Sequence, residues 1–126
     1  MNDPLEVARR YAAASASGDE PALRELHEPD AVVWHNHDGV DQSVDQNLHL
    51  GAWLRRTVPD LRFEDVRHTA TTDGFVQRHL MTGTAPDGTS LGVYSCLIVT
   101  LSDRGRISRV EEYLDSAAVA ALARRS

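Results

Sequence analysis

The fold of this chain is decided by residues 61–114, which read LRFEDVRHTATTDGFVQRHLMTGTAPDGTSLGVYSCLIVTLSDRGRISRVEEYL. Apolar and polar residues tend to alternate along this stretch with a period of two, which is typical of strands with one buried face. We predict four strands, at about 61–72, 75–84, 91–101 and 106–114. Three turn signals separate them: Asp73-Gly74, Asp87-Gly88 and the segment from Ser102 to Gly105. Strands joined in this way predict a mostly antiparallel sheet.

Helix signals lie before and after this stretch. Helices begin at capping side chains, at capping boxes and at a proline in the first turn. They commonly end at a glycine. These signals occur at Asn2-Asp3-Pro4, Gly18-Asp19, Ser43-x-x-Gln46 and Pro59, and Asp115 or Ser116 caps an alanine-rich closing segment. We therefore predict helices over about 4–17, 20–28, 44–58 and 116–125, and a short strand over 31–35.

These elements predict an α+β fold, in the order two helices, a strand, a helix, four strands and a closing helix. We expect a cone-shaped, curved and mostly antiparallel sheet that wraps around helices packed on one of its faces. Such a sheet encloses a blind, conical cavity. The chain has 126 residues and no internal repeat or linker, so we predict a single domain over 1–126.

The composition argues against several classes of partner. A net charge of −6 with dispersed arginines disfavours nucleic acid. No apolar run reaches the roughly 18 residues that a membrane span needs, and no signal peptide opens the chain. A single cysteine, Cys96, excludes an internal disulfide and fits a reducing compartment. We therefore expect a cytoplasmic protein.

Several short segments resemble proteins of the nuclear transport factor 2-like superfamily, which includes ketosteroid isomerases and SnoaL-like polyketide cyclases. The likeness is carried by Arg10-Tyr11-x-Ala13-Ala14, by Gly18-Asp19, by Asp30-Ala31 with the strand through His35, and by residues 105–116. The local likeness is strongest to bacterial ketosteroid isomerases. The resemblance implies the cone-shaped, cystatin-like roll of this superfamily, which hosts many activities.

The resemblance also implies roles for individual residues. Tyr11 falls where the isomerases keep the tyrosine that donates to the substrate oxyanion, and His35 falls where they keep the proton-shuttling aspartate. Their second oxyanion donor, a protonated aspartate, would fall near Leu97, so that acid is missing. Some SnoaL-like cyclases and the limonene epoxide hydrolases place an acidic residue near Glu112. The hydrolases pair it with Arg-x-Asp, whereas this chain has Arg78-His79-Leu80.

The residue types fit acid–base chemistry on a carbonyl compound. An imidazole with an ordinary pKa near 6.5 can accept a proton at neutral pH, so His35 is a candidate general base. The alternative is a strand-end histidine that only bonds to backbone. Tyr11 lies on the apolar stripe of the first helix, where it is either a core residue or a donor to a developing oxyanion.

Glu112 alternates with Val110 and Leu114 on one face of the last strand, which predicts a carboxylate on the inner face. Such a group either has a partner or takes part in chemistry, and a solvated glutamate is the alternative. Only one of Arg78 and His79 can face the same cavity, and we expect it to be His79, as a polar group beside the ligand.

The rest of the predicted cavity is apolar. We expect its walls to include Trp34, Trp53, Phe63, Met81 and Tyr94, which suits a flat, apolar, oxygenated ligand. His35-x-His37 with His79 and Glu112 is a weak metal pattern, and we expect no metal and no other cofactor.

Three functions are consistent with these residues. The first is a cofactor-independent isomerase or cyclase that acts on an apolar, steroid-like or polyketide-like carbonyl compound. The second is a ligand-binding protein of the same fold without turnover, and the third is an epoxide hydrolase-like enzyme that uses Glu112. We also expect a homodimer through the outer sheet face, where Arg109, Glu111 and Tyr113 alternate.

Overall fold

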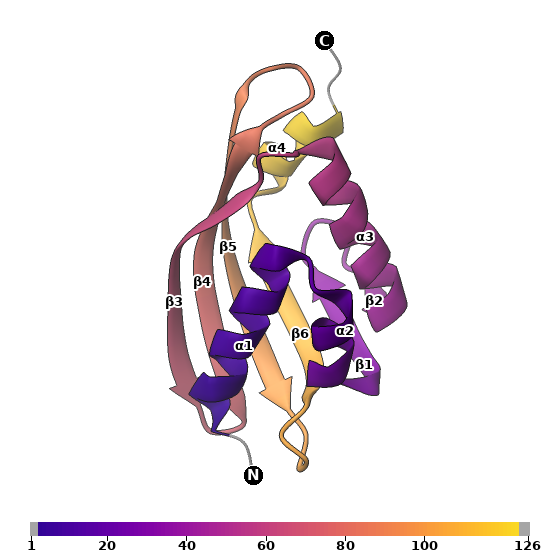
Figure 1. Ribbon diagram of the computed structural model, residues 1–126, viewed down its shortest axis with the longest axis vertical. Coiled ribbons are helices and arrows are strands. Elements are labelled where there is room, and N and C mark those ends of the chain that lie inside the picture. The colour runs from indigo at the N-terminus through magenta and orange to yellow at the C-terminus, as the bar shows by residue number, and fades with distance from the viewer. Residues whose placement is uncertain (1–2, 124–126) are drawn as a thin grey trace.

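Six strands form one curved sheet in the computed structural model, which describes residues 3–123 (Figure 1). In chain order the strands are β1 His27–His35, β2 Asp41–Ser43, β3 Arg62–Thr71, β4 Gly74–Thr84, β5 Ser90–Leu101 and β6 Ile107–Leu114. Their order across the sheet is β2-β1-β6-β5-β4-β3. β1 runs parallel to β6, and the other neighbouring strands are antiparallel. The predicted α+β fold with a curved, mostly antiparallel sheet is confirmed.

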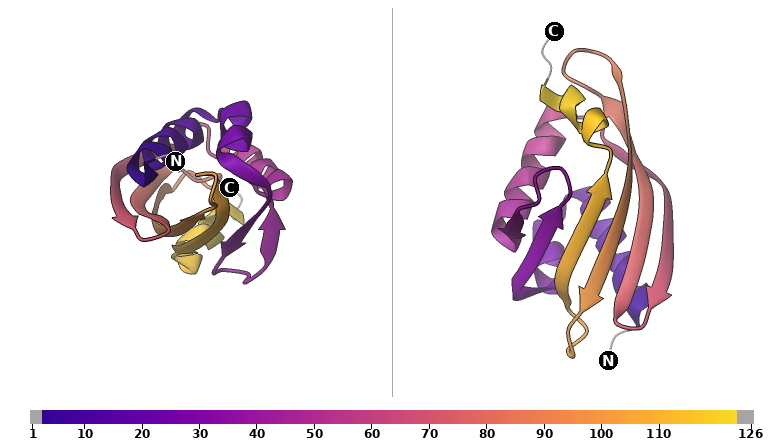
Figure 2. Two further views of the ribbon diagram at one scale, coloured as in Figure 1. Left: turned by 90° about the horizontal axis from the view of Figure 1, so that it is seen from below. Right: turned by 180° about the vertical axis from the view of Figure 1, so that it is seen from behind.

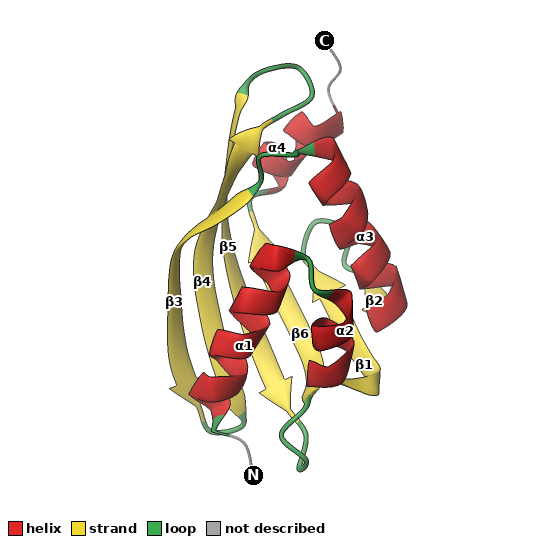
Figure 3. Ribbon diagram, viewed as in Figure 1, coloured by secondary structure: helices red, strands yellow, loops and turns green. Residues whose placement is uncertain are grey.

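Helices cover the concave side of this sheet (Figures 2 and 3). They are α1 Pro4–Ser17, α2 Glu20–Leu26, α3 Val44–Thr57 and α4 Ser116–Ala120, which continues into a 3₁₀ turn, Ala121–Ala123. α1 packs against β3 and β4, and both α2 and α3 pack against β1. The sheet therefore curls around the helices and leaves room between the two layers. Among residues 3–123, no helix has the length and apolar character to cross a membrane.

The helix ends follow the local signals in the sequence. Asp3 and Asp19 are the N-caps of α1 and α2, and Gly18 ends α1 with a left-handed φ of 69°. Ser43 and Gln46 form both hydrogen bonds of the predicted capping box. Asn2, part of the predicted start signal of the first helix, and residues 124–125 of the predicted last helix lie outside the described residues.

The first strand is longer than predicted, because β1 begins at His27 and not at residue 31. Its pairing with β6 changes register between His27 and Val32, which hides the early part of the strand from a period-two pattern. The three-residue strand β2 was not predicted, since so short a segment has no readable period.

The hairpin between β3 and β4 differs by one residue from the prediction. The two turn residues are 72 and 73, and Gly74 already belongs to β4. Gly74 is required by a close approach, since a Cβ there would collide with the carbonyl oxygen of Val99 on β5. The turns at Gly88 and Gly105 are confirmed, and both glycines have positive φ, 88° and 73°.

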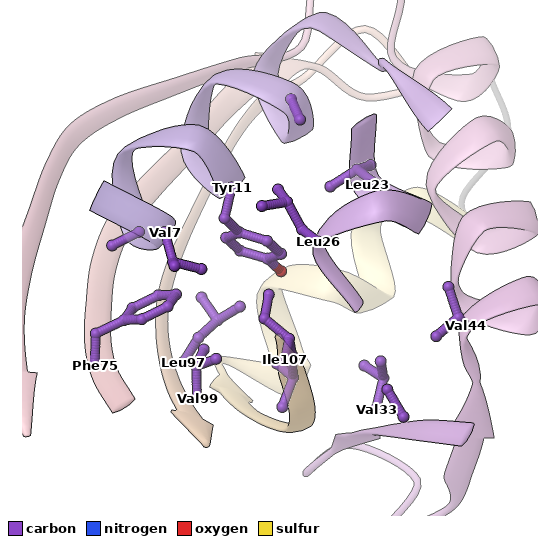
Figure 4. Close-up of a cluster of buried hydrophobic side chains, with 14 of the residues drawn as sticks. Val7, Tyr11, Leu23, Leu26, Val33, Val44, Phe75, Leu97, Val99 and Ile107 are labelled. Carbon is purple, nitrogen blue, oxygen red and sulfur yellow. The ribbon is translucent and has the colours of Figure 1, made fainter. Parts of the chain in front are cut away.

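Strict alternation decides which side chains face the helices. On the inner face β4 presents Phe75, Gln77, His79 and Met81, and β5 presents Leu91, Val93, Ser95, Leu97 and Val99, all buried. The main apolar cluster lies toward the β3–β4 turn and includes Val7, Phe75 and Leu97 (Figure 4). Tyr11 points from α1 into this cluster. A smaller cluster around Val58, Met81 and Val93 lies toward α4.

Candidate active site

A cavity of about 500 Å³ lies between the concave face of the sheet and the helices. That volume is large enough for a small organic ligand. Four polar residues expected at the site line it: Tyr11 from α1, His35 from β1, His79 from β4 and Glu112 from β6. The sequence-predicted Phe63, Met81 and Trp53 line it as well. The cavity is therefore apolar, with a few polar groups that converge from separate elements.

One row of side chains across five strands holds four polar residues and Leu97. Reading across the sheet, His68 on β3 lies opposite Gln77 on β4, and Gln77 lies opposite Leu97 on β5. Leu97 lies opposite Glu112 on β6, and Glu112 pairs with His35 on β1. Residues far apart in the chain are thus brought into line by strand register alone.

His35 and Glu112 are in direct contact at one end of this row. His35 Nε2 lies 3.0 Å from Glu112 Oε1, and the two side chains are only 6% and 15% exposed. The Ser95 hydroxyl donates to the other carboxylate oxygen, Oε2, at 2.6 Å. Both oxygens of Glu112 therefore have a partner, and the carboxylate is fixed in place.

Burial and mutual contact shift the pKa values of Glu112 and His35 in opposite directions. Burial would raise the pKa of Glu112, but hydrogen bonds from His35 and Ser95 and the imidazole charge lower it below its ordinary value. Burial would lower the pKa of His35, but the hydrogen bond to Glu112 and the carboxylate charge raise it above 6.5. Glu112 thus stays ionised at neutral pH, and its contact strengthens His35 as a base.

The second ring nitrogen of His35 is free to accept a proton. His35 Nδ1 is buried and has no hydrogen-bond partner among the described residues. Because Nε2 faces a carboxylate, which can only accept, Nε2 carries the hydrogen of the neutral ring and Nδ1 carries the lone pair. Glu112 therefore selects the tautomer in which Nδ1 is the basic atom.

Tyr11 is held as a neutral phenol. Burial raises its pKa and the charge of Glu112 raises it further, against a hydrogen bond with Ser15. Its ring packs edge-on to His27 and is tilted against Phe75, with centroids 6.1 and 6.2 Å apart. A neutral phenol keeps its hydrogen and can donate it to an oxygen in the cavity.

His79 also faces the cavity and is held by contacts on two sides. Its Nδ1 lies 3.0 Å from Gln77 Nε2, and the ring of Phe63 meets it edge-on at 5.1 Å. Its Nε2 is buried without a partner in the described part of the chain. Burial lowers the pKa of His79, against the charge of Glu112. The neighbouring Arg78 is exposed on the opposite face, so the expectation that His79 and not Arg78 faces inward agrees with this geometry.

Two aromatic residues expected in the cavity wall lie elsewhere. Tyr94 is 73% exposed and belongs to the outer face of β5. Trp34 lies on the outer face of β1, where its ring packs 5.3 Å from that of Tyr113. Both positions alternate with inward residues, so the expectation that they form part of the cavity wall is wrong. Trp53 lines the cavity but is 41% exposed, which places it where the cavity meets solvent.

Three polar residues of the site were missed from the sequence. Ser95 and Gln77 interrupt otherwise apolar inner faces of β5 and β4, so period-two alternation could have revealed them. His68 could not be placed in this way, because a bulge between Glu64 and Arg67 shifts the alternation of β3. Within residues 3–123, no group of three or more histidine, cysteine or acidic side chains is arranged to hold a metal ion.

The family of the chain follows from a comparison with known domains. A family model for the SnoaL-like domain matches residues 8–110, which is most of the chain. This chain belongs to the SnoaL-like domain family. No curated protein matches the SnoaL-like chain significantly.

Solved structures confirm the fold of this SnoaL-like protein. IdmH from Streptomyces antibioticus, a candidate polyketide cyclase, is 23% identical, with a TM-score of 0.82 over 98% of this chain and 100% of its own. An NTF2-like protein of unknown function from Burkholderia pseudomallei K96243 is 17% identical, with a TM-score of 0.81 over 97% and 98%. AclR from Streptomyces galilaeus, a candidate hydroxylase, is 16% identical, with a TM-score of 0.78 over 92% and 81%. The nuclear transport factor 2-like fold expected from the sequence is therefore confirmed, and at these identities the likeness concerns the fold alone.

Proposed function

We propose that this protein is a cofactor-independent acid–base enzyme that forms an enolate from an apolar carbonyl compound, in an isomerase or cyclase reaction. The observation that carries the proposal concerns the ring of His35. Its buried Nδ1 has no hydrogen-bond partner among residues 3–123, and its Nε2 is held by Glu112 at 3.0 Å. A general base of this kind contributes about 10²–10⁴-fold to a rate.

The first step is removal of a proton from the carbon beside the carbonyl group. His35 Nδ1 takes the proton, and Glu112 stabilises the imidazolium that forms. Tyr11 donates its hydroxyl hydrogen bond to the carbonyl oxygen as negative charge develops there. The C–H electron pair becomes the enolate, so charge and protons balance.

The second step returns the proton. In an isomerisation, His35 gives the proton to a different carbon of the conjugated enolate. In a cyclisation, the enolate carbon attacks a second carbonyl group of the same ligand, and the new alkoxide takes the proton. The description of IdmH as a candidate polyketide cyclase supports the cyclase branch for this chain.

His79 supplies a second polar group where the isomerases keep an acid. The position of that acid corresponds to Leu97, which is 3% exposed and cannot donate. His79 lines the same cavity from the neighbouring strand, and its buried Nε2 has no partner among residues 3–123. We assign it the role of binding or protonating the substrate oxygen beside Tyr11.

Hydrogen exchange at carbon tests the proposal without knowledge of the natural substrate. Polycyclic apolar ketones are incubated with the protein in D₂O, and deuterium uptake beside the carbonyl is measured by mass spectrometry. We expect catalysed uptake, with a loss of about 10²–10⁴-fold in His35→Ala. His49→Ala is the matched control, because His49 lies exposed on α3, and its rate should equal that of the wild type.

Two results would contradict the proposal. Tight binding of the ketones without deuterium uptake would make the chain a binding protein. Hydrolysis of apolar epoxides that needs Glu112 but tolerates His35→Ala would make it a hydrolase.

We also propose that the protein is a homodimer through the outer face of the sheet. Tyr94, Ile98 and Tyr113 are large apolar side chains that lie exposed there. Arg109 and Glu111 form an ion pair of 3.0 Å on the same face. A surface that mixes apolar and paired charged groups is suited to meeting its own copy across a two-fold axis.

A further inference from the structure

We propose that His68, acting through Gln77, sets the tautomer of His79, so that His79 presents an N–H group and not a lone pair to the cavity. His68 lies on β3, and the cavity lining within residues 3–123 does not include it. It is therefore a positioning residue, which reaches the site through one intermediate side chain.

The three side chains form a continuous chain of hydrogen bonds. His68 Nε2 lies 2.8 Å from Gln77 Oε1, and Gln77 Nε2 lies 3.0 Å from His79 Nδ1. His68 and Gln77 are directly opposite each other on β3 and β4, and Gln77 and His79 share the inner face of β4. The sheet itself therefore holds the chain of contacts in register.

The amide group of Gln77 decides which atom donates and which accepts in each of these hydrogen bonds. Its oxygen can only accept, so His68 Nε2 carries a hydrogen and donates it. Its nitrogen can only donate here, so His79 Nδ1 offers a lone pair. A neutral imidazole with a lone pair at Nδ1 carries its hydrogen at Nε2. In His79 this Nε2 is the nitrogen that has no partner in the described part of the chain.

The surroundings favour this orientation of the Gln77 amide over the one rotated by 180°. A rotated amide would place a lone pair at His79 Nε2, in the cavity that holds the ionised Glu112. An N–H group is attracted by that carboxylate, and a lone pair is repelled. Phe75 meets the ring of His68 at 6.0 Å and 81°, and Phe63 meets that of His79 at 5.1 Å and 86°. Aromatic contacts therefore hold both histidine rings in addition to their hydrogen bonds.

The consequence for chemistry rests on the proposed function. A donor at His79 Nε2 gives a substrate oxygen a second hydrogen bond in addition to that of Tyr11. Gln77 lies opposite Leu97 and His79 lies opposite Ser95, so this donor is a diagonal neighbour of the position at which the acid of the isomerases is missing. The placement of the hydrogen is a property of the ligand-free protein and does not depend on any reaction.

Nitrogen NMR of the histidine rings tests the placement directly. In the ligand-free wild-type protein at neutral pH, ¹⁵N–¹H spectra should show the His79 hydrogen on Nε2, in a single tautomer. His68→Phe removes the donor to Gln77 and frees the amide to rotate, so the single tautomer should become a mixture. His68→Gln keeps an N–H donor and should restore the single tautomer, and His49→Phe, at an exposed position, should change nothing.

Two outcomes would overturn the inference. One is a wild-type His79 whose hydrogen lies on Nδ1, a measurement that needs no variant and so no assumption about folding. The other is a folded His68→Phe protein with the wild-type tautomer. If the wild-type protein has the His79 hydrogen on Nε2 but catalyses no hydrogen exchange at carbon, only the proposed function is contradicted.

Discussion

The pairing of His35 with Glu112 depends on the one parallel contact of the sheet. β1 and β6 lie side by side with His35 beside Glu112, and both side chains point to the concave face. A buried carboxylate is costly unless it has partners, and here His35 and Ser95 occupy both of its oxygens. The same contacts that make Glu112 tolerable in the interior also fix the imidazole and leave Nδ1 free.

Tyr11 should matter for the rate and little for the fold. We predict that Tyr11→Phe lowers the rate of hydrogen exchange at carbon by about 10²–10³-fold, because one donor to the developing oxyanion is lost. The ring that packs against Phe75 is kept, so the melting temperature should change little. Exchange rates and thermal unfolding measure the two effects.

The control for this change is Tyr113→Phe. Tyr113 is exposed on the outer face of β6, away from the cavity, and its hydroxyl should be dispensable for exchange. Equal losses in both variants would show that the phenol of Tyr11 has no special place in the chemistry.

Strand β4 lies very close to β5 at its first residue. We predict that Gly74→Ala lowers the free energy of unfolding by about 1–3 kcal/mol, because the new methyl group meets the Val99 carbonyl. Gly92→Ala is the matched control, since a Cβ on that strand glycine meets no atom within 4 Å, and its change should stay within about 0.5 kcal/mol. Urea unfolding of both variants measures the difference, and equal stabilities would contradict the close approach.

The regular strands and the helix ends could be predicted from the sequence. The pairing of β4, β5 and β6 keeps one register over the site, so their side chains alternate between the faces. The caps Asp3, Asp19 and Ser43 are local signals. Bulges were the main obstacle. Asp65 adopts a left-handed φ of 54° within the irregular part of β3. Aspartate tolerates this conformation better than most residues, but it occurs too widely in other conformations to mark a change of face. His68 was therefore missed.

The polar site was predicted better than the cavity wall. Tyr11, His35, His79 and Glu112 come together because the sheet and α1 place them in one cavity. Tyr94 and Trp34 are not cavity residues, because alternation places both on the outer face despite their aromatic character. The pairing of His35 with Glu112 could not be foreseen, since it depends on a parallel register between distant strands.

The outer face of the sheet carries a prediction about assembly. We expect wild-type protein at micromolar concentration to sediment as a dimer. Tyr94→Asp should sediment at half that mass, because it puts a charge in the proposed interface at the most exposed of its three apolar residues. A matched control is Val40→Asp, at an exposed apolar residue outside the strands.

Analytical ultracentrifugation measures all three proteins. A wild-type monomer would refute the dimer, and a dimeric Tyr94→Asp variant would move the interface to another surface.

The claim on which the proposed chemistry depends is that Glu112 holds His35 as a base in the interior. The most direct measurement is the pKa of His35 by NMR titration, in the wild type, in Glu112→Gln and in Glu111→Gln. We predict a pKa above 6.5 in the wild type, because contact with the carboxylate outweighs burial, and a fall in Glu112→Gln, where burial acts without that charge. Glu111→Gln, one residue away on the outer face, should match the wild type. The same pKa for His35 in all three proteins would contradict the account.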